Sequence, residues 1–378
     1  MGVGRASSLP LLASILALTL TAQAQDAAKE PNWGAVRKGA LAAIDRNTVQ
    51  RWFDARIQDL LTNEDPKAVQ KNAAEFHKKL MEQYNASDAA PQFKDDLAAL
   101  LAAGFSKTYN PSTDSAKPPH PLGAAMVLMV LRDFAHPAGL PCFKTALTDP
   151  TPAPRFMATE GLNAIRQRLS EQDWAAIIPD LQKAAGREFN NPSLSRMYQL
   201  LFAAAENNNR MDAVATALMG ALDNRALGFE QDNRFPLRAD GEAAAWLADK
   251  AIQGNNNTLR VAVCRRAARL LANAVFSYLN DRPNSSLQEQ LELVVLSIEP
   301  KLEALAKASD RNVKIPEPTV RAAMLGGTEN RHNKMTAALN LWIGSGQTQG
   351  VLNNPPFSFP VGLEITRKQP ATATAPAS

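Results

Sequence analysis

Apolar residues recur along most of this chain with the three-to-four-residue spacing of an amphipathic α-helix. The segment from Leu259 to Tyr278 illustrates the pattern. At 100° per residue, one side of such a helix carries Val263, Cys264, Ala267, Leu270, Leu271, Ala274, Val275 and Tyr278. The other side carries Arg265, Arg266 and Arg269. We predict a helix that buries the apolar stripe and turns the arginines to solvent, with an anion-binding patch as the alternative.

Short polar turns separate these periodic segments. They contain asparagine and proline in clusters: Asn190-Asn191-Pro192, Asn207-Asn208-Asn209 and Gly254-Asn255-Asn256-Asn257. Asparagine and glycine tolerate the left-handed conformation that ends a helix, and proline suits the first turn of the next one. Alanine and leucine dominate, and alternating runs of Val, Ile and Thr are nearly absent. The fold class predicted is therefore all-α.

The first 24 residues have the features of a cleavable signal peptide. Arg5 precedes the apolar run Leu9–Leu20, and the small-residue triplet Ala22-Gln23-Ala24 follows. A retained membrane anchor is the alternative, but this run has 12 residues, whereas a bilayer-spanning helix needs about 20. We expect cleavage near Ala24, a mature chain that starts near Gln25, and a periplasmic or secreted location.

The remainder divides by composition. We predict an N-terminal helical region over residues 25–105 and a linker over residues 106–121, where four prolines interrupt the periodicity. Helices then resume over residues 122–345. Residues 346–378 form a C-terminal extension that ends in a disordered tail of alanine, threonine and proline. No segment after the signal peptide is long and apolar enough to cross a membrane.

The segment from Ala146 to Arg166 resembles a HEAT repeat. It has Asp-Pro after an apolar helix end, an arginine six positions after the aspartate, and small or apolar residues at helical spacing beyond: Asp149, Pro150, Arg155, Ala158, Leu162 and Ile165. The aspartate and proline end the incoming helix, and the small alanine permits close helix approach. In the N-terminal region, the segment from Glu64 to Leu80 has Gln70 where this arginine is expected, so it is not counted as a repeat.

These markers recur. Pro192 follows Pro150 by 42 residues, Arg196 follows Arg155 by 41, and Arg238 follows Arg196 by 42. The P-x-P-x-x-R pattern of residues 150–155 returns at residues 316–321, an offset of 166 residues, although the marker expected between Arg238 and Arg321 is missing. HEAT and armadillo repeats have about 40–47 residues. The resemblance thus implies a right-handed α-solenoid of HEAT-like helix pairs; a non-repeating helical bundle is the alternative.

Charge and cysteine content narrow the candidate functions. Without Arg5, 40 of the 41 basic residues remain against 37 acidic ones, a net charge of +3 with no concentrated basic stripe. This argues against nucleic acid as the partner. The two cysteines, Cys142 and Cys264, are too few for a disulfide scaffold. The sequence allows two alternatives: a single disulfide bridge between them, or two separate buried thiols.

No catalytic, cofactor or metal motif is present in the mature chain. The best metal candidates are His120 and His136, which flank Asp133, but each precedes a proline and we interpret both as turn residues. No catalytic, cofactor-binding or metal-ligating residue is predicted. An array of helix pairs with an extended surface suits binding to another protein, so we expect a protein-binding scaffold in the cell envelope.

The alternative function is an all-α periplasmic enzyme that acts on polysaccharide through paired carboxylates. Asp95-Asp96 and Glu160 are the positions to examine. Sugar sites commonly use exposed aromatic rings, whereas the tryptophans here lie scattered among helical positions and are expected to be core anchors: Trp33, Trp52, Trp174, Trp246 and Trp342.

Overall fold

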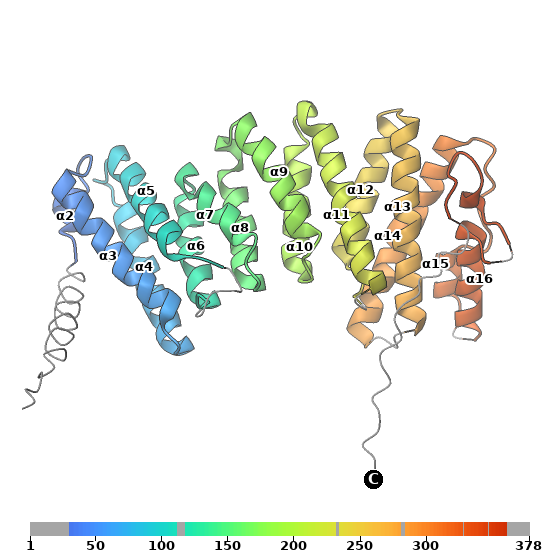
Figure 1. Ribbon diagram of the computed structural model, residues 1–378, viewed down its shortest axis with the longest axis horizontal. Coiled ribbons are helices and arrows are strands. Elements are labelled where there is room, and N and C mark those ends of the chain that lie inside the picture. The colour runs from blue at the N-terminus through green and yellow to red at the C-terminus, as the bar shows by residue number, and fades with distance from the viewer. Residues whose placement is uncertain are drawn as a thin grey trace, which may run out of the picture. The chain divides into compact units, whose positions relative to one another are not determined.

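The computed structural model describes residues 30–111, 118–231, 234–280, 284–327, 329–346 and 348–360. The predicted signal peptide and the Ala/Thr/Pro tail lie outside these residues. The described chain is all-α and consists of helices that pack mostly with their neighbours in sequence (Figure 1). None of these helices has both the length and the apolar character needed to cross a bilayer.

The chain divides into two compact units between Asp173 and Trp174. The predicted domain boundaries, with a linker at residues 106–121, stay predictions. Unit 1 contains seven α-helices within the described residues: α2 Trp33–Val36, α3 Ala43–Thr62, α4 Pro66–Tyr84, α5 Pro91–Thr108, α6 Pro121–Phe134, α7 Leu140–Ala146 and α8 Pro152–Ile165. Two 3-10 turns follow α6 and α8: η1 Pro137–Gly139 and η2 Arg166–Arg168.

Alternate helices of unit 1 lie side by side. Helix α3 contacts α5, α5 contacts α7, and likewise α4 contacts α6 and α6 contacts α8. The α3–α5 pair runs in the same direction, because Arg46 pairs with Asp96 near one end and Asp54 pairs with Lys107 near the other. Helices α3 and α6 also approach closely, at Gly123 of α6, where a Cβ atom would lie 1.9 Å from the carbonyl oxygen of Leu60 in α3. Unit 1 therefore consists of two interleaved series of helices.

Unit 2 begins within α9 and has the same alternation. Its elements are α9 Glu171–Ala185, α10 Asn191–Ala204, η3 Asn208–Arg210, α11 Met211–Gln231, α12 Arg238–Gln253, α13 Asn257–Asn280, α14 Ser285–Ser309, α15 Val320–Leu325, α16 Arg331–Ile343 and η4 Val351–Asn353. Helices α10, α12 and α14 contact one another in turn, as do α11, α13 and α16. The alternation therefore holds from α10 to α14, whereas α13 next meets α16, the third helix after it.

Helix α13 confirms the predicted apolar stripe and corrects the prediction for the arginine side. All of the stripe residues are buried, and so are Asn273 and Ser277. Arg266 pairs with Asp223 at 2.6 Å and Arg269 pairs with Glu230 at 2.6 Å, both acids belonging to α11. These two arginines therefore join neighbouring helices instead of simply facing solvent, because α13 is contacted by α11, α12, α14 and α16.

Buried acidic side chains hold the starts of several helices. In unit 1, Asp149 accepts hydrogen bonds from the backbone N–H of Thr151 at 2.7 Å and from the hydroxyl of Tyr109. In unit 2, Glu299 of α14 accepts from the N–H groups of Val320 and Arg321, both at 2.7 Å. The first N–H groups of a helix have no partner within that helix, and such carboxylates supply one.

In unit 2 a further buried acid, Asp240, joins three helices. It accepts from the backbone N–H of Leu237 at 2.8 Å, from the hydroxyl of Tyr198 in α10 at 3.2 Å and from the guanidinium of Arg225 in α11 at 2.8 Å. The side chains of Arg225 and Asp240 are both completely buried. Arg225 also donates to the carbonyl of Glu188, in the turn before α10. This cluster fixes α10, α11 and α12 together.

Candidate functional site

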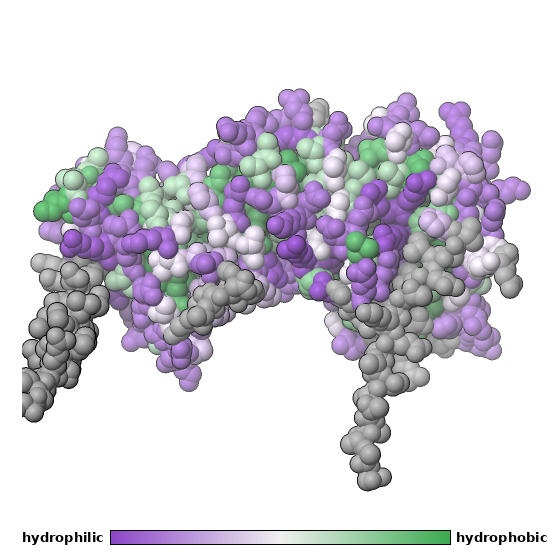
Figure 2. Space-filling view, viewed as in Figure 1, coloured by the Kyte–Doolittle hydropathy of each residue, from purple (hydrophilic) through white to green (hydrophobic). Residues whose placement is uncertain are grey.

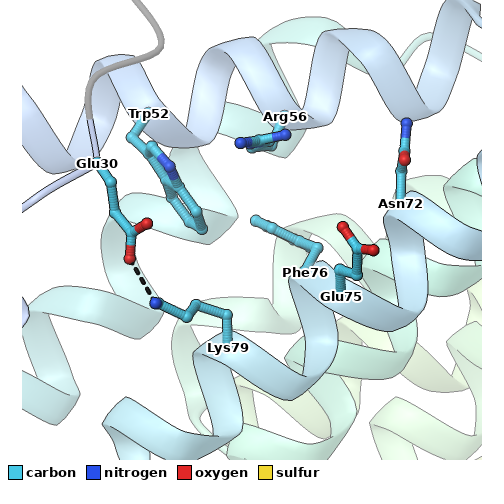
Figure 3. A pocket seen from close by; sticks show the side chains of 7 residues that line it. All are labelled: Glu30, Trp52, Arg56, Asn72, Glu75, Phe76 and Lys79. Atoms are coloured by element: carbon cyan, nitrogen blue, oxygen red, sulfur yellow. Dashed lines mark ion pairs between the residues drawn. The ribbon is translucent and has the colours of Figure 1, made fainter.

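A pocket of about 160 Å³ lies between α3 and α4 in unit 1. Figure 3 shows its lining: Trp52 and Arg56 from α3; Asn72, Glu75, Phe76 and Lys79 from α4; and Glu30 from the segment before α2. The four α4 positions are spaced by three, one and three residues, so they share one face of that helix. Both helices are held by their buried apolar residues, which makes the pocket a preformed feature of unit 1.

Two aromatic rings form the floor of the pocket. The rings of Trp52 and Phe76 lie 5.5 Å apart, and both side chains are buried. Trp33 meets Trp52 edge to face at 5.4 Å, and Phe53 packs against both floor rings. The indole N–H of Trp52 is buried without a hydrogen-bond partner. The floor therefore combines two buried aromatic rings with a buried indole N–H donor, and charged groups surround it.

An ion pair closes one end of the pocket. Lys79 Nζ lies 2.6 Å from Glu30 Oε1, and the indole N–H of Trp33 donates to the same carboxyl oxygen at 3.0 Å. The hydrogen bond from Lys79 lowers the pKa of Glu30 below its usual range, and the positive charge of Arg56 contributes in the same direction. Glu30 is thus ionised and already paired.

The opposite part of the pocket carries Arg56, Glu75 and Asn72. The Arg56 guanidinium lies 5.7 Å from the centre of the Trp52 ring, a cation–π distance. The Asn72 side-chain N–H donates to Asp59 at 2.8 Å, which orients the carboxamide. Glu75 is exposed at the rim. These groups place donors and acceptors around an aromatic slot.

The pocket contains two carboxylates beside a tryptophan, which bears on the polysaccharide hydrolase alternative. A glycosidase needs one carboxyl group that stays protonated near neutral pH, and this requires a raised pKa. Glu30 is shifted the other way by Lys79. Glu30 therefore does not fit the role of the protonated acid in such a mechanism.

The two histidines considered as metal candidates are helix caps. His120 Nδ1 accepts from the N–H of Gly123 at 3.4 Å, and His136 Nδ1 accepts from the N–H of Ala138 at 3.1 Å. This agrees with their interpretation as turn residues. Asp133 instead pairs with His77 at 2.7 Å. Within the described parts of the chain, no group of three or more His, Cys, Asp or Glu residues could hold a metal ion.

The acidic residues considered for catalysis have separate partners. Asp96 accepts from the backbone N–H of Leu41 at 2.9 Å and binds Arg46, so it connects α5 to α3 and the turn before it. Asp95 instead faces His136 at 3.3 Å. Glu160 lies on α8 and, like the two aspartates, is not among the pocket-lining residues.

Both cysteines are free and buried, which decides between the two options left open by the sequence. Burial raises the pKa of the Cys264 thiol to about 12. Burial also raises the pKa of Cys142, against the opposing effect of a hydrogen bond with Ser106. Thiols in this state are poor nucleophiles, so neither cysteine marks a reactive site.

A second surface of interest lies on unit 2. Phe202 of α10 and Trp246 of α12 stack at 4.9 Å with an angle of 14° between their planes, and both are half-exposed. The other four tryptophans are buried, as predicted for core anchors, but Trp246 is not. On α14, Leu293 and Leu296 are 38% and 36% exposed. Figure 2 shows a mostly hydrophilic visible surface on which apolar residues form small separate groups.

Sequence reasoning did not find the α3–α4 pocket. Trp52 was assigned correctly to the core, but nothing in the pattern indicates that it also floors a cavity. The α4 face at residues 72, 75, 76 and 79 was the available signal, since it mixes charge with a buried phenylalanine. The role of Glu30 depends on a tertiary contact and has no local signature.

Comparison of the chain with models of protein families, with curated proteins and with solved structures finds no match.

Proposed function

We propose that this protein is an exported protein-binding scaffold, built as an α-solenoid of HEAT-like helix pairs. The observation that carries the proposal is the packing of alternate helices in each unit. Helices α3, α5 and α7 form one series and α4, α6 and α8 another; in unit 2, α10, α12 and α14 form one series, and α11 contacts α13 beside it. Stacked helix pairs of this kind expose extended surfaces suited to another polypeptide.

Recurring hydrogen bonds support the repeat. In two of them a tyrosine donates to a buried aspartate further along the chain: Tyr109 to Asp149 over 40 residues and Tyr198 to Asp240 over 42. These separations fall in the range of HEAT-like repeats. The bond from Trp342 to Glu299 spans 43 residues in the opposite direction along the chain and does not repeat the pattern.

The arginine markers support the repeat less well. Arg155 donates to the carbonyls of Asp149 and Pro150, so it closes the turn before α8. Arg238, in contrast, pairs with Glu242 on its own helix at 2.8 Å. The HEAT-like assignment therefore rests on helix packing and on the hydrogen bonds from Tyr109 to Asp149 and from Tyr198 to Asp240. The spacing of the arginines is secondary.

The surface of the α10–α12–α14 series is the proposed partner surface of unit 2. Helix α14 turns Val294 and Ser297 toward Gly241 of α12 and leaves Leu293 and Leu296 exposed. Exposed apolar side chains and aromatic pairs of this kind are typical contact residues of protein interfaces. The half-exposed Phe202–Trp246 stack adds two aromatic contact residues, from α10 and α12 of the same series.

Site-specific photo-crosslinking in the source cells tests the proposal. A photoreactive amino acid replaces Ala245, which is half-buried on α12 next to Trp246, and the control replaces Ala213, which is exposed on α11. We expect a defined protein adduct from position 245 and none from position 213. The polysaccharide hydrolase alternative predicts no adduct from either position and release of sugar from envelope polysaccharide by the purified chain; that combination would refute the scaffold.

A further inference from the structure

The last described segment of unit 2, residues 350–360, folds back over the end of α16, and we call it the C-terminal strap (Figure 1). Arg265 of α13 donates a hydrogen bond to the backbone carbonyl of Phe357. The side chain of Asn353 donates to the carbonyl of Ile343, the last residue of α16, at 2.9 Å. These bonds place the strap against α13 and α16, which also contact each other.

The strap has an apolar inner side and an exposed outer side. Leu352, Phe357 and Phe359 are only 0%, 1% and 5% exposed. The residues that lie between and beside the two phenylalanines in the sequence are exposed: Asn354, Pro355, Ser358 and Pro360. The strap is therefore an outer layer that covers apolar surface of unit 2, and its outer side carries no other described element.

Hydrogen bonds within the strap close it into a loop. The N–H of Phe359 donates to the carbonyl of Leu352 at 2.8 Å, and the Asn353 side chain donates to the carbonyl of Phe359 at 3.0 Å. The N–H of Phe357 donates to the carbonyl of Asn354 at 3.0 Å. Because these bonds do not involve the helices, the loop is a self-contained ligand that happens to be joined to its own binding surface.

The backbone of the strap and of its connection to α16 favours release. Ser358 has a φ of 43°, a left-handed conformation that residues other than glycine rarely adopt and that costs free energy. Gly344, which ends α16, has a φ of 79°, and Gly346 has nothing within 4 Å of an added Cβ atom. Ordering the backbone of the strap opposes the burial of its three apolar side chains. The strap thus has the features of a local unit that opens before the helices do.

We propose that the C-terminal strap is a built-in ligand that keeps a binding site on α13 and α16 closed. A partner protein opens the site by supplying a turn segment that carries leucine and two phenylalanines in the same arrangement. The site offers the guanidinium of Arg265 to a backbone carbonyl, the carbonyl of Ile343 to an amide N–H, and apolar surface to the three side chains. The inference rests on the proposed scaffold function and names the chemistry of one of its partners.

The test uses the full-length chain and a fluorescent peptide with the sequence of residues 350–360, followed by fluorescence anisotropy. The double variant Phe357→Ala/Phe359→Ala removes both rings from the strap and leaves the helices unchanged. Apparent affinity falls in proportion to the fraction of sites that are open. We therefore expect the peptide to bind the double variant at least about tenfold more tightly than the wild-type chain. A peptide with alanine in place of both phenylalanines should bind neither.

A matched pair of further substitutions locates the site on α13. Arg265→Met, added to the double variant, should weaken peptide binding roughly tenfold, because it removes a hydrogen bond from a charged donor. Arg238→Met, which replaces an exposed arginine of α12, is the control and should leave peptide binding unchanged.

Hydrogen exchange of the wild-type chain tests release without any variant. The amide of Phe359 should exchange faster than that of Leu271, a buried residue of α13, because the strap opens locally. Equally slow exchange of these two amides would overturn the proposal even if the double variant did not fold. Equal affinity of the peptide for the wild-type chain and the folded double variant would also overturn it. A crosslinked partner at position 245 combined with no binding of the peptide would remove the strap assignment and leave the scaffold standing.

Discussion

The buried Arg225–Asp240 pair provides the sharpest test of how unit 2 is held together. Both side chains are fully buried, and they belong to α11 and α12. Arg225 also donates to the carbonyl of Glu188, while Asp240 accepts from Tyr198 and from the N–H of Leu237. Isolated buried charges are costly, so each partner depends on the other.

Replacing Arg225 by methionine preserves much of the chain length and removes the charge. Asp240 would then be a buried carboxylate with only two neutral donors, the Tyr198 hydroxyl and the Leu237 N–H. Breaking a buried pair in this way costs about 3–5 kcal/mol of unfolding free energy. The double variant Arg225→Met/Asp240→Asn removes the stranded charge, and the single amide oxygen can still accept from one of the two donors, which bind different oxygens of Asp240. We expect it to be more stable than Arg225→Met alone by about 1–2 kcal/mol.

Hydrogen exchange of the amides in α10–α12 measures the loss of stability locally, which matters because proteins can open in separate local units. Urea unfolding followed by tryptophan fluorescence provides a second measurement. Arg238→Met is the control, because Arg238 and Glu242 are exposed and their pair contributes no more than about 1 kcal/mol. If the costs of Arg225→Met and Asp240→Asn simply add in the double variant, the two charges are uncoupled and this explanation is refuted.

Three further predictions address packing, thiol chemistry and pH. Gly123→Ala places a methyl group 1.9 Å from a backbone oxygen of α3 and should cost about 1–3 kcal/mol or more; Gly39→Ala meets nothing within 4 Å, so equal thermal unfolding temperatures for the two variants would contradict it. Neither Cys142 nor Cys264 should react with Ellman's reagent until the protein is denatured, and rapid reaction of the native protein would contradict their burial. The pKa of Glu30 lies below 4.5, so its contribution to stability is fully present above 4.5 and is lost as the pH falls through the folded-state pKa; a carboxyl titration midpoint at or above 4.5, measured by carbon-13 NMR, would show that its ion pair does not persist in solution.

The sequence predicts the helices better than it predicts their surroundings. The stripe on α13 and the histidine caps follow from local chemistry, because helical spacing and an X-Pro step act over a few residues. Burial of the polar side of α13 depends on α11, and the position of Asp223 beside Arg266 is not encoded within either segment alone. The same limit applies to the pocket, where Glu30 reaches Lys79 from outside the helix pair.

Sequence reasoning was also limited for Trp246. Its spacing on α12 resembles that of a core residue, yet it stacks on Phe202 at the surface of the helix series. Periodicity assigns a residue to a side of its helix, but only the adjacent helix determines whether that side is covered. Exposed aromatic contacts between neighbouring helices are therefore found only after the helices have been assembled.

The packing of alternate helices has a consequence for how the protein reaches its folded state. In each series a helix meets its principal partner within one or two helices along the chain, so most native contacts close short loops. Chains rich in local contacts fold quickly. Each unit can accordingly assemble progressively, from its N-terminal end, while the rest of the polypeptide is still being synthesised.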